Sequence, residues 1–156
     1  MRARGFTLIE LVVTVAIIGL LTSAAMPLVR ITAQRERESE LHQSLRILRA
    51  AIDNYKEAAD MGRVRLVVGD SGYPPTLQTL VDGVEDAQSE KKTMMYFLRR
   101  LPRDPFFPDT TVAPAETWGL RSSKSPPTDP QPGDDVFDVF SMAQGKGLNG
   151  IAYHEW

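Results

Sequence analysis

The chain has 156 residues, a length that fits one small domain and an appended segment. Its formal net charge of −2 at pH 7 argues against nucleic acid as a partner, because binding phosphate groups requires a basic surface. Cysteine is absent, which excludes both a disulfide framework and a thiolate metal site.

The first expected element is a helix over residues 6–26, which are apolar or small except for Glu10. A helix of this length spans about 30 Å, the thickness of the hydrocarbon core of a bilayer. Arg2 and Arg4 precede it, and positive charge at this end predicts that the N-terminus stays in the cytoplasm while the rest is exported. The sequence therefore predicts a transmembrane helix, with a buried helix of a soluble protein as the alternative.

Pro27 is expected to kink this helix rather than end it, because the residues after it remain helical in character. Apolar residues form one stripe down the second half of the helix, at spacings of four and three: Leu41, Leu45, Leu48, Ile52 and Tyr55. Charges of both signs at 35–40 are typical of a solvated face. Gly62 follows Asp60 as a stop signal, so the amphipathic half of the helix is expected over residues 27–62.

The remaining residues, 63–156, are expected to form a small α+β head. Ten of the eleven prolines lie at Pro74 or later, which excludes further long helices over much of this region. Short helices are expected over 77–84, with Thr76 as a candidate cap, and over 94–101.

The head is also expected to contain short strands. Residues 136–141 favour extended structure through their β-branched and aromatic side chains, and 118–120 are the expected hairpin partner across the proline-rich loop at 125–132. A further short strand is expected over 63–68. The long helix would then pack under a short antiparallel sheet.

The stretch GFTLIE at residues 5–10 resembles the N-terminal signal of type IV pilins and pseudopilins, and every position matches. The resemblance implies a pilin-like α+β fold with a long N-terminal helix. It also implies that a membrane prepilin peptidase cuts between Gly5 and Phe6, removes the leader over residues 1–5 and methylates the new N-terminus at Phe6. Pro27 lies where this family places its helix-kinking proline.

Glu10 places a carboxylate at the head of the apolar helix, which is costly in a membrane unless the charge is paired or reaches the interface. Cleavage would expose an ammonium group at Phe6, and in a helical stack of subunits Glu10 of one copy can meet the amine of its neighbour. Such a pair would offset the desolvation and fix the stagger between subunits. The simpler alternative is a Glu10 side chain that snorkels to the membrane interface.

An ordinary secretory signal is a second interpretation of the N-terminus. Arg2 and Arg4 would form its basic region, residues 11–21 its apolar region and residues 23–25 its small-residue cleavage site. Glu10 argues against this interpretation, because a charge at the edge of the apolar region weakens insertion.

Three later segments resemble the major pseudopilins of type II secretion. Residues 72–76, GYPPT, are similar to the stretch that follows the long helix in those proteins. Residues 98–106, LRRLPRDPF, are similar to their L-x-x-L-P-x-D-P-W segment, with Phe106 in place of the tryptophan. Residues 136–141, VFDVFS, match their final strand.

The same resemblance implies a calcium site in the C-terminal loops, but the residues at 141–147, SMAQGKG, depart from the family pattern. Ala143 replaces a glycine, and Gly145 stands where the family has an aspartate. Lys146 adds a positive charge beside it. Because calcium prefers several oxygen ligands and gains from carboxylates, this loop is a poor match.

We therefore expect no cofactor and no bound metal. Asp134, Asp135 and Asp138 could contribute carboxylates to a calcium site, but three nearby acids on a loop are more often solvated. The tail extends past the usual family pattern, and Tyr153 and Trp156 are expected to fold back on the head as a substitute clamp.

No arrangement of residues typical of an active site is found. His42 and His154 lie far apart in the sequence, and the glycines at 145–150 precede no helix, as a phosphate-binding loop would require. Asp134 and Asp135 lack the apolar surroundings that would separate their pKa values. An enzyme is not expected.

The sequence thus predicts a structural subunit of a type II secretion pseudopilus, which is processed by prepilin peptidase and assembled into a helical filament that helps to export proteins. It would start as a single-pass protein of the bacterial inner membrane, with a cytoplasmic N-terminus and a periplasmic head, and then join a periplasmic filament. The expected partners are other copies of the chain, the prepilin peptidase/methyltransferase, the inner-membrane assembly platform and minor pseudopilins.

Two other functions remain open. A subunit of a type IV pilus would be expected to have a longer head, often with a disulfide loop. A single-pass, membrane-anchored periplasmic binding module would work uncleaved and as a monomer.

Overall fold

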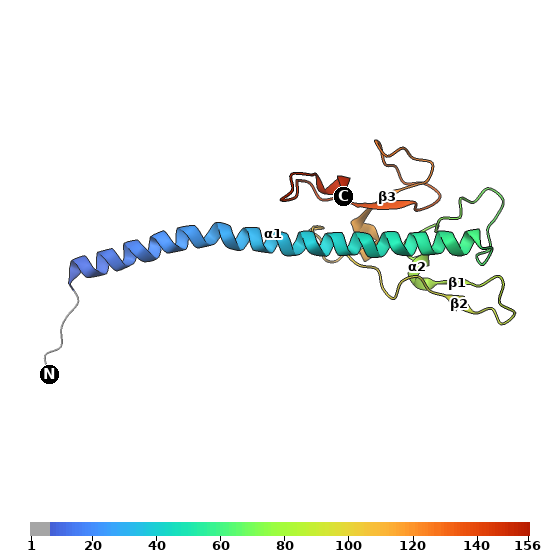
Figure 1. Cartoon of the computed structure of the whole chain (residues 1–156), viewed down its shortest axis with the longest axis horizontal. Coiled ribbons are helices and arrows are strands. Elements are labelled where there is room, and N and C mark those ends of the chain that lie inside the picture. The colour runs from blue at the N-terminus through green and yellow to red at the C-terminus, as the bar shows by residue number, and fades with distance from the viewer. Residues whose placement is uncertain (1–6) are drawn as a thin grey trace. The chain divides into compact units, whose positions relative to one another are not determined.

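The computed structural model describes residues 7–156, apart from the side chains of residues 24–28. The chain divides into two compact units, one up to Glu36 and one from Arg37 onward. The long helix α1, Leu8–Asp60, contributes to both units (Figure 1). The other described elements belong to the second unit: α2 (Thr79–Asp82), β1 (Val84–Glu85), β2 (Met94–Met95), the 3-10 helix η1 (Pro114–Thr117), β3 (Trp118–Arg121), β4 (Asp138–Ser141) and the 3-10 helix η2 (Tyr153–Glu155).

The start of α1 is set by Thr7, whose hydroxyl accepts a hydrogen bond from the backbone amide of Glu10 (3.3 Å). This bond satisfies one of the amides that the first turn of a helix leaves without a partner. Pro27 does not end the helix, which extends to Asp60 as the sequence predicts. The side chain of Pro27 lies outside the described residues, so the kink stays a prediction.

The end of α1 is a Schellman motif, which confirms the predicted stop at Gly62. Gly62 adopts a φ of 71°, a left-handed conformation that glycine tolerates because it has no Cβ. The amide of Arg63 donates to the carbonyl of Ala58, and the amide of Gly62 donates to that of Ala59, both at 2.9 Å. These bonds satisfy two of the last carbonyls of the helix and turn the chain into the head.

A membrane-spanning helix was predicted over residues 6–26. Within the part of the chain that the structure describes, no helical stretch combines the length and the hydropathy needed to cross a bilayer. Phe6 and the side chains of residues 24–26 lie outside that part, so the predicted span is only partly represented in it.

The core of the second unit forms along the apolar stripe of α1. The five residues of the predicted stripe are each at most 4% exposed: Leu41, Leu45, Leu48, Ile52 and Tyr55. They belong to one cluster with Leu80 of α2, Trp118 of β3 and Val139 of β4. Burying a large apolar side chain of this kind contributes roughly 1.5–3 kcal/mol, so this stripe holds the head to the helix.

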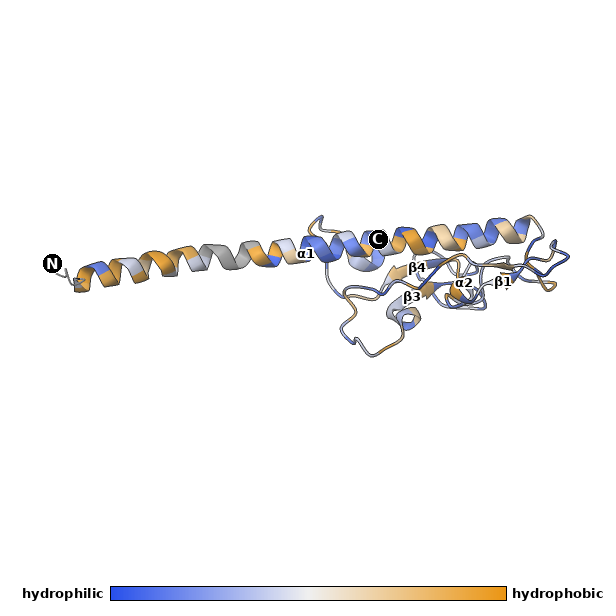
Figure 2. Cartoon of the chain, turned by 90° about the horizontal axis from the view of Figure 1, so that it is seen from below, coloured by the Kyte–Doolittle hydropathy of each residue, from blue (hydrophilic) through white to orange (hydrophobic). Residues whose placement is uncertain are grey.

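The antiparallel hairpin of β3 and β4 confirms the strands predicted on either side of the proline-rich loop. Trp118 pairs with Ser141, and Leu120 pairs with Val139. The indole nitrogen of Trp118 donates a hydrogen bond to the carbonyl of Pro102 (3.0 Å), which satisfies the polar end of a buried ring. Figure 2 shows that β3 and β4 lie on the same side of α1 as β1.

The strand predicted over 63–68 is wrong. Val64 is buried, but Val67 and Val68 are exposed and take part in a turn. The Asp70 carboxylate accepts a hydrogen bond from the amide of Val67 (2.7 Å), and the amide of Asp70 donates back to the carbonyl of Val67 (3.0 Å). These two bonds close a β-turn over residues 67–70, which is incompatible with an extended strand, and β-branched side chains alone do not supply a neighbouring strand.

The helical turns predicted over 94–101 are also wrong. Met94 and Met95 form β2, which pairs antiparallel with β1. The amides of Phe97 and Leu98 then both donate to the carbonyl of Leu80, at 3.0 and 2.9 Å. These backbone groups therefore find partners far away in the sequence, which a local apolar pattern does not reveal.

The helix predicted over 77–84 is present but shorter, as α2 over Thr79–Asp82. The hydroxyl of Thr76 accepts a hydrogen bond from the amide of Thr79, the first residue of α2 (3.2 Å). The predicted capping residue is thus bonded to the start of the helix. Gly83 ends α2 with a φ of 77° and leads directly into β1.

Candidate functional site

The first turn of α1 brings Glu10 into an apolar surface. Leu8, Ile9 and Leu11 surround it in the sequence, and they are between 60% and 81% exposed. Ten large apolar residues of this stretch are exposed within the described chain: Leu8, Ile9, Leu11, Val12, Val13, Val15, Ile17, Ile18, Leu20 and Leu21. Figure 2 shows their hydrophobic colour along the start of α1. Apolar surface of this extent is typical of contact with lipid or with another protein.

The polar side chains within this stretch are satisfied by the helix itself. The hydroxyls of Thr14, Thr22 and Ser23 donate to carbonyls of the preceding turn, each at 2.8 Å. Such bonds let a hydroxyl remain in apolar surroundings without a partner from outside. They leave Glu10 as the charged group of this surface.

The spacing Thr7-x-x-Glu10 is that of a capping box, a helix-start signal that the sequence interpretation missed. The structure contains the half of the box in which the Thr7 hydroxyl accepts from the Glu10 amide. An acidic residue in the first turn also interacts favourably with the helix dipole. Glu10 therefore has a local role in starting α1 as well as the assembly role predicted for it.

The two residues predicted for processing, Gly5 and Phe6, lie outside the described residues. The predicted pairing of Glu10 with an amine at Phe6 is therefore not tested by the structure. Among the described side chains, the Glu10 carboxylate makes no hydrogen bond or ion pair.

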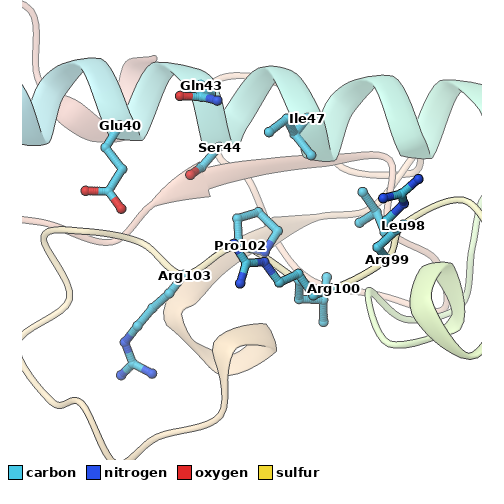
Figure 3. Close-up of a pocket in the computed structure, with 10 residues that line it drawn as sticks. Glu40, Gln43, Ser44, Ile47, Leu98, Arg99, Arg100, Pro102 and Arg103 are labelled. Carbon is cyan, nitrogen blue, oxygen red and sulfur yellow. The ribbon is translucent and has the colours of Figure 1, made fainter.

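A groove of about 530 Å³ lies between α1 and the segment 98–103. Glu40, Gln43, Ser44 and Ile47 face this segment from α1, as Figure 3 shows. Three arginines line its other side: Arg99, Arg100 and Arg103. These lining residues include no histidine and no serine paired with a base, so the groove has no arrangement typical of an active site.

The C-terminal tail lies against a polar stripe of α1, and it confirms the predicted fold-back of Tyr153 and Trp156. The Tyr153 hydroxyl donates to the carboxylate of Glu38 (3.0 Å), and the amide of Leu148 donates to the same oxygen (2.9 Å). The ring of Trp156 stacks on His42, with centroids 4.0 Å apart and planes 4° from parallel. Glu38 had been predicted to be solvated, but it is only 9% exposed because the tail covers it.

Arg49 joins this tail to the hairpin. Its Nε donates to the carboxylate of Asp138 (2.8 Å), and its Nη2 donates to the backbone oxygens of Val139 (3.1 Å) and Trp156 (2.6 Å). One guanidinium therefore connects α1, β4 and the end of the tail. A planar group with several donors is suited to this role, and lysine could not reproduce it.

The acids near the C-terminal loop are used in other contacts. Asp138 pairs with Arg49 and approaches Arg121 at 3.5 Å. Asp134 pairs with Lys124. Asp135 is bonded to serines at the base of the proline-rich loop, where burial raises its pKa but hydrogen bonds from Ser122, Ser123 and Ser71 outweigh this and lower the pKa to about 2.

The loop at 141–147 itself offers little to a calcium ion. The hydroxyl of Ser141 donates to the buried carboxylate of Asp104 (2.5 Å), which also accepts from the amide of Phe106 (2.8 Å). Within the described residues no group of three or more histidine, aspartate or glutamate side chains could hold a metal ion. At the position where the family has an aspartate the loop has Gly145, and the neighbouring Lys146 is positively charged, so these residues are a poor match for the calcium site that the family resemblance implies.

Comparison with known proteins gives two kinds of match. Residues 1–26 match the prokaryotic N-terminal methylation motif. The chain is 29% identical to the type II secretion system core protein G of Klebsiella pneumoniae, over 86% of this chain and 93% of that protein. It is 27% identical to the protein of the same name from Dickeya chrysanthemi, over 96% of this chain and 95% of that protein. No solved structure gives a significant match.

Proposed function

Because the chain is a type IV pilin-like protein similar to core protein G of type II secretion systems, we propose that it is a structural subunit of a type II secretion pseudopilus. One observation carries the proposal: the methylation motif at residues 1–26 includes the start of α1, whose described large apolar side chains at 8–21 are exposed. A helix that is apolar on all sides requires lipid or other helices to cover it. The chain is not an enzyme, since its relatives are core proteins of a secretion system.

Processing of the N-terminus is the first step of the proposal. Prepilin peptidase cuts between Gly5 and Phe6, removes the leader at 1–5 and methylates the amine of Phe6. The methylation motif that matches residues 1–26 supports this step. Removal of the leader also removes Arg2 and Arg4, so the cleaved helix no longer carries a basic anchor on the cytoplasmic side.

Assembly is the second step, and Glu10 sets its register. The carboxylate lies among exposed apolar side chains, so covering this surface with lipid or protein would desolvate it. An amine at Phe6 of a neighbouring copy supplies the opposite charge that makes this burial tolerable. The hydroxyls of Thr14 and Thr22 donate to carbonyls of their own helix, so they are not alternative hydrogen-bond donors that would compete with the amine for this carboxylate.

The proposed location follows from the same features. The chain starts in the bacterial inner membrane with its N-terminus in the cytoplasm and its head in the periplasm, and then enters a periplasmic filament. Its partners are other copies of the chain, the prepilin peptidase/methyltransferase, the assembly platform of the inner membrane and minor pseudopilins. Similarity to a secretion-system core protein over most of the chain supports this set of partners.

The first test is the N-terminal sequence and intact mass of the chain purified from its native membrane. A methylated Phe6 at the start is the expected result. A start at Met26 would indicate an ordinary secretory signal, and an intact Met1 would indicate an uncleaved anchor. Either of these two results would refute the pseudopilin proposal.

The second test separates processing from assembly. Glu10→Ala is expected to abolish incorporation into filaments and to leave cleavage after Gly5 intact, because the peptidase step precedes pairing between subunits. Glu36→Ala is the matched control, since it removes an exposed carboxylate from the same helix. Filaments that form normally with Glu10→Ala would show that this carboxylate does not set the register.

A further inference from the structure

We propose that the C-terminal loop is held on α1 by protein side chains alone, which take the place of the calcium ion implied by the family resemblance. The contacts form a C-terminal clamp of five residues: Glu38, His42, Arg49, Tyr153 and Trp156. This inference does not depend on the filament proposal, because every contact in it lies within the second unit of one chain.

The polarity of the clamp suits an anion at the centre of the loop rather than a cation. The amide of Leu148 and the hydroxyl of Tyr153 both point hydrogens at one carboxylate oxygen of Glu38. Calcium is bound by oxygen atoms that act as acceptors, so a loop that presents donors repels it. The loop is therefore held by donors that point at the Glu38 carboxylate, whereas a calcium ion would be held by acceptors that point at a cation.

Arg49 supplies the positive charge that backbone oxygens near the loop need. Its guanidinium donates to the backbone oxygens of Val139 and Trp156, two groups of the kind that a calcium ion coordinates. The same side chain neutralises Asp138, which removes a carboxylate from any metal site. A fixed arginine thus does within the chain what a bound cation would do.

The loop also closes through its own backbone. The amide of Gly147 donates to the carbonyl of Ile151 (2.8 Å), and the amide of Tyr153 donates to the carbonyl of Gly145 (3.3 Å). Gly145 adopts a φ of 122°, a conformation that an aspartate at this position would not readily adopt. The residue change that removes a family ligand is therefore the one that allows this turn.

Aromatic packing fixes the end of the tail. Tyr153 stacks on Phe106 with ring centroids 4.4 Å apart, and it meets Trp156 edge-on at 5.1 Å. Trp156 in turn stacks on His42. Phe106, which stands where the family has a tryptophan, therefore contacts the tail through the ring of Tyr153.

The test compares thermal unfolding of the full chain in detergent with calcium chloride and with excess EGTA. Tm, followed by the near-ultraviolet signal of the two tryptophans, is expected to be the same in both. A calcium ion at about 100 times its Kd would instead raise Tm by roughly 5–10 °C. Such a rise would overturn the proposal.

A variant tests the clamp itself. Tyr153→Phe removes only the hydroxyl that bonds Glu38 and is expected to lower Tm by about 5 °C. Tyr96→Phe is the matched control, because Tyr96 is 65% exposed. If the two variants unfold at the same temperature, the hydrogen bond to Glu38 does not hold the tail.

Hydrogen exchange gives a readout that does not depend on the variants. The amides at 147–153 are expected to be protected equally in EGTA and in calcium chloride. Protection that appears only with calcium would overturn the proposal, even if Tyr153→Phe failed to fold.

Discussion

Asp135 ties together the two ends of the loop that joins β3 to β4. Its carboxylate accepts hydrogen bonds from the hydroxyl of Ser122 (2.6 Å) and from the amide (3.0 Å) and hydroxyl (2.5 Å) of Ser123. The residue is only 6% exposed, so water competes weakly for these bonds. Replacing it with asparagine removes the charge and turns an acceptor into a donor that faces the serines.

The size of the effect follows from the pKa of Asp135. Burial raises this pKa, but the serine hydrogen bonds outweigh burial and lower it from 3.8 to about 2. Each pKa unit corresponds to about 1.36 kcal/mol, so the ionised group contributes about 2 kcal/mol to the free energy of unfolding at neutral pH. Because the folded-state pKa is lowered, this contribution is complete above pH 3.8 and is lost as the pH falls toward 2.

The assay is urea unfolding of the wild type and Asp135→Asn from neutral pH down to about pH 3. The variant is expected to be less stable by about 2 kcal/mol or more at neutral pH, with a difference that narrows below about pH 4. Asp134→Asn is the control, because the Asp134 side chain is 91% exposed and should show neither effect. A difference that stays constant across the whole pH range would refute the argument that the charge of Asp135 is the stabilising feature.

Two further substitutions test the packing and the turn of the head. Leu45→Ala in the buried stripe is expected to lower the free energy of unfolding, measured in urea, by about 3 kcal/mol. Ile47→Ala is the control, because Ile47 is 41% exposed on the same helix, and it should cost less than about 1 kcal/mol. Equal losses for the two variants would contradict the assigned core. Gly62→Ala is expected to cost about 1 kcal/mol because it forces a Cβ into the left-handed conformation. Gly62→Asn should cost less than Gly62→Ala and therefore have the higher Tm of the two variants, since asparagine tolerates the left-handed conformation better than alanine.

The features predicted correctly from the sequence are those encoded by neighbouring residues. The spacing of Leu41, Leu45 and Leu48 places them on one face of a helix, whatever that face packs against. This spacing correctly predicted the buried stripe of α1. Gly62 supplies a backbone conformation that ends a helix locally. The strand at 136–141 was recognised from side chains that favour extended structure, although β4 begins only at Asp138.

The wrong predictions depend on partners that are distant in the sequence. Met94 and Met95 read as part of a helical turn, but their backbone pairs with Val84 and Glu85. Glu38 was predicted to be solvated because its neighbours on α1 are charged, and nothing in the sequence linked the exposed His42 to the tail. Only the arrival of Tyr153 and Trp156 from the end of the chain buries one and stacks on the other, and no local pattern contains that information.

The C-terminal clamp has a consequence for the order in which the head folds. Its hydrogen bonds join residues 107 to 115 positions apart in the chain. At equilibrium a long closure is only slightly less favourable than a short one, because each doubling of loop length costs about 0.6 kcal/mol. During folding, however, contacts between distant residues form after local ones. We therefore expect α1 to form while Glu38 is still hydrated. A chain whose synthesis or export has not yet reached Leu148 therefore has Glu38 and Arg49 of α1 without their contacts to the tail. The fold of the head is complete only when residues 148–156 pack against the helix.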